Sequence, residues 1–573
     1  MKKFLIFLLL PFTFIAQNIN LLTPYELGNG NQSTTYKECI EYYKTLDKSF
    51  ETISMQTMGL TDSGEPLHIV VFNGEKEFNF KKLKDTKAII LVNNGIHPGE
   101  PDGIDASMML LRDLATSKIK VPKNTVIAVI PIYNIGGSLN RNSHSRANQN
   151  GPEAYGFRGN ARNFDLNRDF IKTDTRNSRS FQELFHIVNP DMFIDNHVSN
   201  GADYQYTFTC IATSYQRLGG ELGVFYNQEM HPSIMSDLKK KKIESVPYVN
   251  IRGDKPDDGF AQFMDSPRYS TGYTTLFNTI GSVPETHMLK DFASRVNVTY
   301  EYMVSTINYV DKNYIIIKKL RKDNLNIYKE KLTYPLQWEI DSSKVSTIKF
   351  KGYEGTYKPS DVSGKDRLYY DKKLPFTKNI PFYNDYKPTK TIVIPAYYVV
   401  PKSQWPIIEL LRLNNIEMNA LVYDKDIEVE SYKIADYKTA KYPYEGHYGH
   451  YDTKVTSTIK KIKFYEGDYL ISTNQPGVKY IIETLEPEAV DSYFNWNYFD
   501  AILQQKEHFS AYVFEDLAFD ILNKNSKLKE EFEIKKSTDI KFKENGSAQL
   551  DWIYKNSEYY EKAHFQYPIY RIK

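Results

Sequence analysis

His97 and Glu100 are the residues whose types and spacing most directly suggest chemistry in this chain. They follow an apolar run, Ala88 to Val92, and precede a stretch with helical spacing, so both side chains can turn toward one point at a strand end. Imidazole nitrogen and carboxylate oxygen are usual zinc ligands, and a catalytic zinc site has three protein ligands and one open position. His197, which closes another apolar strand-like segment, is the candidate third ligand.

The His97–Glu100 pair is a weak signal by itself, because a glutamate at the start of a helix is also stabilised by the helix dipole. Further polar motifs strengthen it, since they follow in a definite order along the chain. They are Thr57 to Leu67, which contains Gly-Leu-Thr-Asp-Ser-Gly-Glu-Pro-Leu, then Asn163 to Phe170, and finally Val283 to His287. The ordered set is far more specific than any single member.

With these motifs the chain resembles the M14 zinc carboxypeptidases, the carboxypeptidase A-like metallopeptidases, over roughly residues 36–309. The resemblance implies one zinc ion (Zn2+) per catalytic domain, with the ligands His97, Glu100 and His197. It also implies that Glu285 is the general base, and that Asn167 and Arg168 bind the terminal carboxylate of the substrate. A guanidinium can bind a carboxylate through two hydrogen bonds, which a lysine cannot reproduce.

Two further roles of this family have several candidates here. An arginine stabilises the oxyanion, and of Arg141, Arg146, Arg158 and Arg162 the distance before Arg168 favours Arg146. No tyrosine stands at the family's usual distance before the general base, and the nearest candidate substrate-binding tyrosines are Tyr269 and Tyr273. This departure leaves the substrate cap and the pocket for the terminal side chain undetermined. Arg268 either favours an acidic terminal side chain or lies on the surface.

Three other histidines call for an interpretation. His287 stands two residues after Glu285, so in a continuous strand it points to the same side and can line the same cleft without being a metal ligand. His447 and His450 form an HxxH pair in a segment rich in glycine and tyrosine. We interpret that segment as a loop, because two histidines without a third ligand make a poor zinc site.

The first residues are typical of a secretory signal peptide, which we place at residues 1–16. Lys2 and Lys3 form a basic start, Phe4 to Ile15 is apolar, and Ala16 is small. A buried helix and a retained anchor are the alternatives, but the apolar run is shorter than the ~20 residues of a membrane-spanning helix. We therefore expect a secreted or periplasmic protein with no transmembrane segment after signal removal.

The charge balance narrows the possible partners. The 573 residues include 73 Lys and Arg against 71 Asp and Glu, so there is no electrostatic case for nucleic acid or for an anionic membrane surface. The expected partner is a peptide substrate with a free C-terminus. The two cysteines, Cys39 and Cys210, can form a disulfide outside the cytoplasm or stay two buried thiols, and the sequence leaves both open.

Alternating predicted strands and helices favour an α/β fold, a mostly parallel mixed sheet flanked by helices. Apolar runs at 88–92, 126–132 and 192–194 predict buried strands, and helical spacing is found at 36–46, 104–114, 176–188 and 291–320. A change in composition divides the chain into a catalytic domain, residues 17–325, and an α+β accessory domain, residues 326–573, of unknown role.

The predicted activity is hydrolysis of the C-terminal peptide bond of peptides by a zinc-activated water, with Glu285 as general base. One alternative is a zinc amidase acting on a special substrate, either a peptidoglycan stem peptide or an N-acyl amino acid. The other is a non-catalytic peptide-binding module, for which a broken ligand set or a missing base is expected. Neither the preferred terminal residue nor the oligomeric state follows from the sequence.

Overall fold

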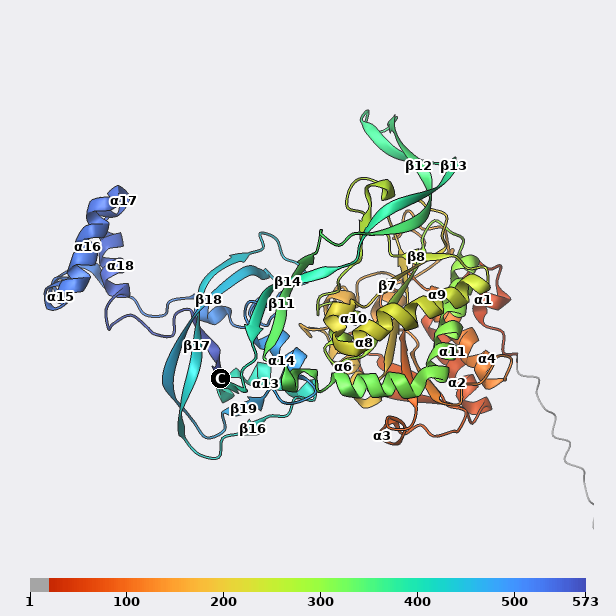
Figure 1. Ribbon diagram of the computed structural model, residues 1–573, viewed down its shortest axis with the longest axis horizontal. Helices are drawn as coiled ribbons and strands as arrows, with labels where there is room; N and C mark the ends of the chain where they lie inside the picture. The colour runs from red at the N-terminus through yellow and green to blue at the C-terminus, as the bar shows by residue number, and fades with distance from the viewer. Residues whose placement is uncertain (1–19) are drawn as a thin grey trace, which may run out of the picture.

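A mixed sheet of nine strands forms the centre of the N-terminal part of the protein (Figure 1). The computed structural model describes residues 20–573, so the predicted signal peptide lies outside the described residues. The strands lie in the order β1-β2-β4-β3-β5-β10-β7-β8, and β6 pairs with β10. Their bounds are β1 Ile53–Leu60, β2 Pro66–Phe72, β3 Ala88–Asn93, β4 Thr125–Ile130, β5 Met192–Asp195, β6 His197–Ser199, β7 Phe208–Ala212, β8 Ser245–Pro247 and β10 Ile280–His287.

The centre of the sheet is parallel, and antiparallel pairs join it to the strands on both sides. Strands β4, β3, β5 and β10 run in one direction, whereas β2 pairs antiparallel with β4 and β7 pairs antiparallel with β10. The central strands are continuous apolar runs because both of their faces are covered. The predicted α/β class with a mixed sheet is therefore confirmed.

Helices cover both faces of this sheet. On one face Ile90 and Val92 pack with residues of α2, α4, α8, α9 and α11, and on the other Ile89 and Leu91 pack with residues of α3, α6 and α10. The first group has the bounds α2 Tyr36–Ser49, α4 Asp102–Ala115, α8 Gly220–Phe225, α9 His231–Lys240 and α11 Phe292–Asn324. The second group has the bounds α3 Phe80–Leu83, α6 Arg176–Val188 and α10 Ser270–Thr275. The predicted helices at 36–46, 104–114, 176–188 and 291–320 are thus present.

The local sequence explains where the helices near the site begin and end. The Thr35 side chain and Glu38 form a capping box at the start of α2, and Thr175 caps α6. Asn189 ends α6 in the left-handed conformation, which asparagine adopts more readily than most residues. Helix α4 begins two residues after Glu100, and its first residue, Asp102, is held by a buried Arg295 at 3.0 Å.

The C-terminal part adds three smaller sheets. Strands β11 (Thr333–Ile340) and β14 (Tyr386–Val393) pair, while β12 (Ser346–Pro359) and β13 (Asp366–Tyr383) form a long hairpin that adds to β9 (Phe260–Ala261). A six-stranded sheet has the order β16-β19-β15-β20-β17-β18. Its bounds are β15 Tyr397–Val400, β16 Asn419–Ala420, β17 Lys425–Thr439, β18 His450–Phe464, β19 Tyr469–Ser472 and β20 Gln566–Ile572.

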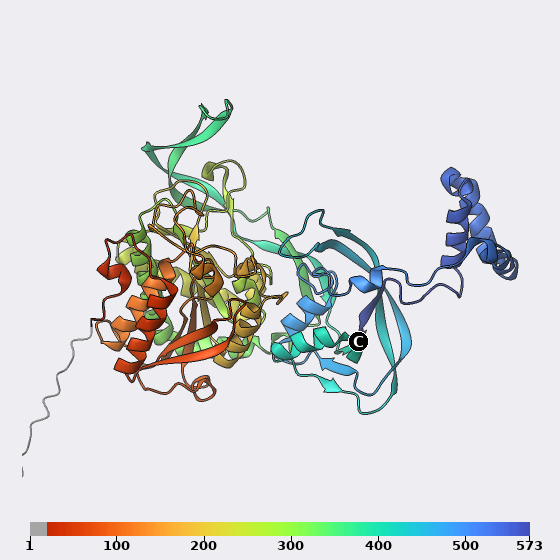
Figure 2. The same ribbon diagram turned by 180° about the vertical axis from the view of Figure 1, so that it is seen from behind.

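The two parts of the chain share one hydrophobic core. Residues of α13 (Trp405–Leu413) and α14 (Val478–Leu485) belong to the same buried cluster as α6 and α10. Figures 1 and 2 both show that the helices α15 to α18 stand apart from this body. These helices have a small hydrophobic core of their own. They have the bounds α15 Ala511–Lys524, α16 Ser526–Thr538, α17 Ile540–Lys543 and α18 Gly546–Lys555. The domain division at 325/326 stays a proposal.

The structure decides one question that the sequence left open. Cys39 in α2 and Cys210 in β7 are both buried and both free, so no disulfide joins them. Across the described residues, no helix combines the length and the apolar character needed to cross a membrane.

Candidate active site

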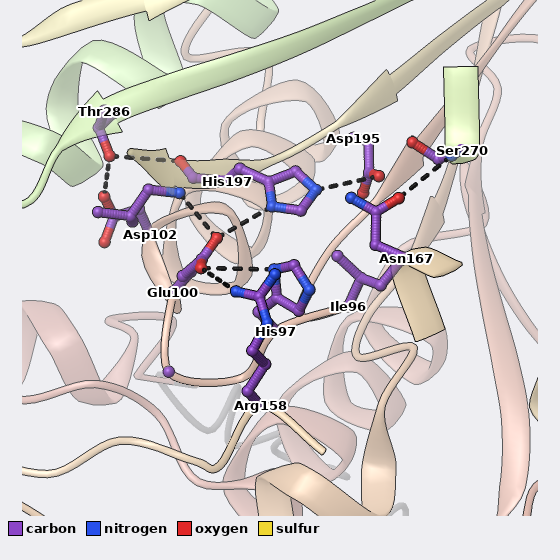
Figure 3. A network of polar contacts seen from close by, with 12 residues as sticks. Ile96, His97, Glu100, Asp102, Arg158, Asn167, Asp195, His197, Ser270 and Thr286 are labelled. Atoms are coloured by element: carbon purple, nitrogen blue, oxygen red, sulfur yellow. Dashed lines mark hydrogen bonds and ion pairs between the residues drawn. The ribbon is translucent and has the colours of Figure 1, made fainter. Parts of the chain in front are cut away.

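His97, Glu100 and His197 meet at the carboxyl ends of the central strands. His97 lies in the loop after β3, Glu100 lies just before α4, and His197 is the first residue of β6. One ligand atom from each can be chosen so that all three lie within 4.8 Å of one another. Nδ1 of His97 lies 3.4 Å from Glu100 Oε1, and Nδ1 of His197 lies 3.0 Å from Glu100 Oε2. Figure 3 shows both imidazole rings directed toward this carboxylate.

The outer nitrogens of both rings are held by carboxylates, which fixes the tautomer. Nε2 of His97 donates to Asp165 Oδ1 at 2.9 Å, and Nε2 of His197 donates to Asp195 Oδ2 at 3.1 Å. In the neutral form of each ring, Nδ1 then carries the lone pair, on the side of Glu100. Nδ1 of His97 is buried and has no hydrogen-bond partner among residues 20–573. A buried acceptor of this kind fits a metal cation, and a carboxylate behind each ligand is typical of zinc sites.

The negative groups around the three predicted ligands favour a positive charge at the point where the ligands meet. Burial acts to raise the pKa of Glu100, but the charges of Arg146 and His97 outweigh it and hold that pKa well below its usual range. Burial acts to lower the pKa of His197, but Asp195 and Glu100 raise it well above its usual range. The same negative groups that stabilise a proton on the imidazole also attract a divalent cation.

Glu285 lies beside the ligands on β10. Its Cα pairs with that of His197 across the parallel β10–β6 contact, and its side chain lines the same cavity as the three ligands. Burial, with a further contribution from Glu100, raises the pKa of Glu285 to about 8. A positive charge at the ligand set opposes both causes, so a bound cation favours the ionised base.

Two arginines, not one, reach the ligand set. Nη1 of Arg146 lies 2.7 Å from Glu100 Oε1, and Nη1 of Arg158 lies 3.5 Å from the same oxygen. Arg158 also donates from Nε to Asp165 Oδ2 at 2.9 Å. Both side chains line the cavity, so Arg158 joins Arg146 as a candidate for oxyanion stabilisation.

Asn167 and Arg168 occupy a short 3-10 turn, Leu166–Arg168, at the edge of the cavity. Asp165 caps this turn by accepting a hydrogen bond from the Asn167 backbone at 2.9 Å. The guanidinium of Arg168 lies over the Tyr269 ring, 4.5 Å from its centroid. Tyr269 also lines the cavity, so the structure brings together three of the four predicted substrate-binding residues.

Tyr273, the fourth predicted substrate-binding residue, lies away from the cavity. Its side chain is fully buried in the core, and its hydroxyl donates to Asn414 Oδ1 at 2.6 Å. The two tyrosines differ because Tyr269 precedes α10 whereas Tyr273 lies inside this helix and faces the core. We therefore retain Tyr269 alone.

Four other side chains are engaged outside the cavity. Nε2 of His287 donates a hydrogen bond to the carbonyl oxygen of Ala202 at 2.8 Å, and this side chain does not line the cavity. Arg268 is paired with Asp491 at 2.7 Å and does not line the cavity, which gives no support to the alternative that it attracts an acidic terminal side chain. His447 and His450 are paired with separate carboxylates, Asp174 at 2.7 Å and Asp500 at 3.0 Å. The interpretation as a loop holds for His447 but is wrong for His450, which is the first residue of β18.

Sequence reasoning missed several residues of the cavity. Tyr248 and Asp265 line it, yet neither belongs to a recognisable motif. Burial is the main reason why the pKa of Asp265 is raised to about 6. The role of Asp165 could have been noticed, because it opens the same Asp-x-Asn-Arg segment that supplies Arg168.

Comparison with known proteins bears on this geometry. Residues 39–210 match the family model of the zinc carboxypeptidases, Peptidase M14. Residues 39–210 are thereby identified as M14 zinc carboxypeptidase sequence. The matched residues include the three ligands and the Asn167–Arg168 turn, whereas Glu285 lies beyond them. The match places the chain among the metallocarboxypeptidases, which are enzymes.

Curated relatives are similar over most of their length. Carboxypeptidase 2 of Trichophyton rubrum is 23% identical over 498 residues, which covers 81% of this chain and 84% of the relative. Carboxypeptidase 2 of Trichophyton equinum is 22% identical over 505 residues, covering 82% and 85%. Both alignments are longer than the carboxypeptidase domain, so the similarity extends into the C-terminal part.

Solved structures show a more limited likeness. A metallo-carboxypeptidase from Burkholderia cenocepacia has a TM-score of 0.36 at 14% identity, covering 49% of this chain and 70% of that one. Carboxypeptidase A from Helicoverpa armigera has a TM-score of 0.36 at 13% identity, covering 51% and 75%.

Proposed function

We propose that this enzyme is a zinc-dependent carboxypeptidase that releases the C-terminal residue of peptides with a free terminal carboxylate. The observation that carries the proposal is the shared cavity. One cavity is lined by a metal-ligand set, a buried carboxylate beside it and an arginine at its edge, namely His97, Glu100, His197, Glu285 and Arg168. A generic zinc hydrolase needs the first two features, whereas the third is expected of an enzyme that binds a free carboxylate, as a carboxypeptidase does.

His97, Glu100 and His197 would hold the zinc ion, which would supply Lewis acidity for activating a water and the scissile carbonyl. Glu285 accepts the proton of the attacking water and delivers it to the leaving amine. Its position beside the ligand set in the same cavity supports this role, since a general base must lie within reach of the proton that it accepts.

The remaining cavity residues bind the substrate. Arg168 and Asn167 contact the terminal carboxylate. The ring of Tyr269 packs against one face of the Arg168 guanidinium in a cation–π contact. Arg146 stabilises the negative charge that develops on the carbonyl oxygen, with Arg158 as the competing candidate. A preorganised donor of this kind is typically worth ~3–4 kcal/mol.

The test uses a mixed pool of peptides, half with free and half with amidated C-termini, analysed by mass spectrometry with and without a zinc chelator. We expect chelator-sensitive loss of single residues from free C-termini only. The Glu285→Gln variant should retain zinc but lose activity by a factor of about 10²–10⁴, because proton transfer is lost. Wild-type activity in that variant contradicts the role of Glu285.

The other outcomes of this experiment point to different functions. Equal cleavage of free and amidated peptides indicates that the enzyme recognises a part of the substrate other than the terminal carboxylate. No cleavage at all, with zinc bound, favours an amidase for peptidoglycan stem peptides or N-acyl amino acids, or a peptide-binding module. We further propose that the enzyme acts outside the cytoplasm as a secreted or periplasmic protein, on the basis of its N-terminal sequence.

A further inference from the structure

The turn between β17 and β18 of the C-terminal part lies against the 3-10 turn that carries Arg168. We name residues 440–449 the docking turn. The Tyr444 hydroxyl accepts a hydrogen bond from Arg168 Nε at 2.8 Å, although the two residues are 276 positions apart. The neighbouring Glu445 accepts a hydrogen bond from the backbone N–H of Asp165 at 2.8 Å. A segment outside the carboxypeptidase domain therefore contacts two residues of its site.

We propose that the docking turn completes the carboxylate subsite and that Tyr444 is a positioning residue for Arg168. The C-terminal part thereby receives a role in substrate binding. This inference rests on the proposed function, because it deepens the role given there to Arg168.

The contacts of Arg168 fix the guanidinium without occupying all of it. Nε donates to Tyr444, Nη1 donates to the Asn167 carbonyl at 2.9 Å, and one face lies on the Tyr269 ring. Within residues 20–573, Nη2 has no hydrogen-bond acceptor, which leaves it available for a carboxylate in the cavity. An arginine held in this way loses less rotamer freedom when the substrate binds, so binding is stronger than to a mobile side chain.

Glu445 acts on the same subsite through the backbone. The Asp165 that it holds also accepts hydrogen bonds from Nε2 of His97 and from the backbone of Asn167, both at 2.9 Å. One side chain of the docking turn thus fixes the residue that orients a metal ligand and caps the Arg168 turn. The hydrogen bond from Asp165 to Glu445 therefore links the docking turn to a residue that contacts the predicted metal ligand His97.

The docking turn is itself well anchored. Gly446 has φ +81°, and a Cβ added there would lie 3.0 Å from a ring carbon of Phe164, so the turn packs closely against the carboxypeptidase domain. His447 pairs with Asp174 at 2.7 Å. The Tyr444 ring stacks on Trp496, with 6.5 Å between centroids and 21° between planes. The Tyr444 hydroxyl is therefore held in place before any substrate arrives.

The test compares two tyrosines of the docking turn in the full-length, zinc-loaded protein. Tyr444→Phe removes only the hydroxyl that Arg168 contacts, and Tyr442→Phe is the matched control because its side chain is 81% exposed. The substrate is the best free-acid peptide from the pool, and the released amino acid is the probe for calorimetric binding. We expect Tyr444→Phe to raise KM and the Kd of the amino acid about fivefold, while kcat changes less than about twofold.

A purely structural role predicts a different pattern, in which the active fraction and the apparent kcat fall while KM and Kd stay constant. A double-mutant cycle adds a second readout, since Tyr444→Phe should have no further effect on Kd once Arg168 is replaced by Ala. The inference is overturned if Tyr444→Phe matches Tyr442→Phe in KM and Kd, or if its effect persists in the Arg168→Ala background. If the wild-type chain cleaves no free-acid peptide, the proposed function itself fails, and the inference fails with it.

Discussion

Asp165→Asn should weaken zinc binding although Asp165 is not a ligand. Its carboxylate accepts a hydrogen bond from His97 Nε2 at 2.9 Å, which leaves Nδ1 as the nitrogen that faces the metal position. The variant keeps an oxygen in the same place but loses the negative charge, which supports the basicity of the ring. A hydrogen bond to a charged group contributes about 1.5–3 kcal/mol, and the loss of such a partner weakens metal binding about 10- to 100-fold.

The assay is competition for zinc with a chromogenic chelator at fixed pH, which gives the Kd of each variant directly. The matched control is Asp500→Asn, because Asp500 pairs with His450 Nε2 at 3.0 Å in the same manner but outside the site. We expect the control to bind zinc like the wild type. Equal zinc affinity in both variants refutes the reasoning, since the carboxylate behind His97 would then contribute nothing to the ligand set.

Two further predictions concern charge in the protein. Arg146→Ala should lower kcat/KM about 10²- to 10³-fold if Arg146 stabilises the oxyanion, and a larger loss in Arg158→Ala would transfer that role to Arg158. Burial raises the pKa of Asp105 to about 7, with a further contribution from Asp102 and against hydrogen bonds from Thr34. Because the folded pKa exceeds the unfolded one of about 3.9, this group favours the folded state fully below pH ~4 and loses that effect as the pH rises through ~7. Asp105→Asn should therefore raise the Tm more at pH 8 than at pH 5 in thermal unfolding, and an equal change at both pH values contradicts the buried charge.

The sequence predicts the centre of the fold and the ligand set well, for physical reasons. Strands such as β3 are continuous apolar runs, a pattern expected of a strand that has helices packed on both of its faces. His97, Glu100 and His197 follow strand ends, and parallel strands bring their carboxyl ends to one edge of the sheet. At these positions the apolar pattern of each strand and the arrangement of the strands in the sheet lead to the same site, so the order of the motifs along the chain was enough to predict the ligand set.

Other features depend on packing that no local pattern encodes. Tyr269 and Tyr273 are four positions apart, and only the orientation of α10 sends the second into the core. Arg146 and Arg158 both reach Glu100 from an irregular segment, so their distance along the chain could not separate them. The contact of Tyr444 with Arg168 depends on how two parts of the chain dock.

The docking turn has a consequence for the order in which the protein matures. The ligands and the base are complete once residue 285 has been made, but the partners of Arg168 and Asp165 follow only at residues 444 and 445. On the inference above, full affinity for peptide ends therefore follows synthesis and folding of the C-terminal part. A chain cut short after its carboxypeptidase domain would retain the zinc ligands but would lack these partners of Arg168 and Asp165.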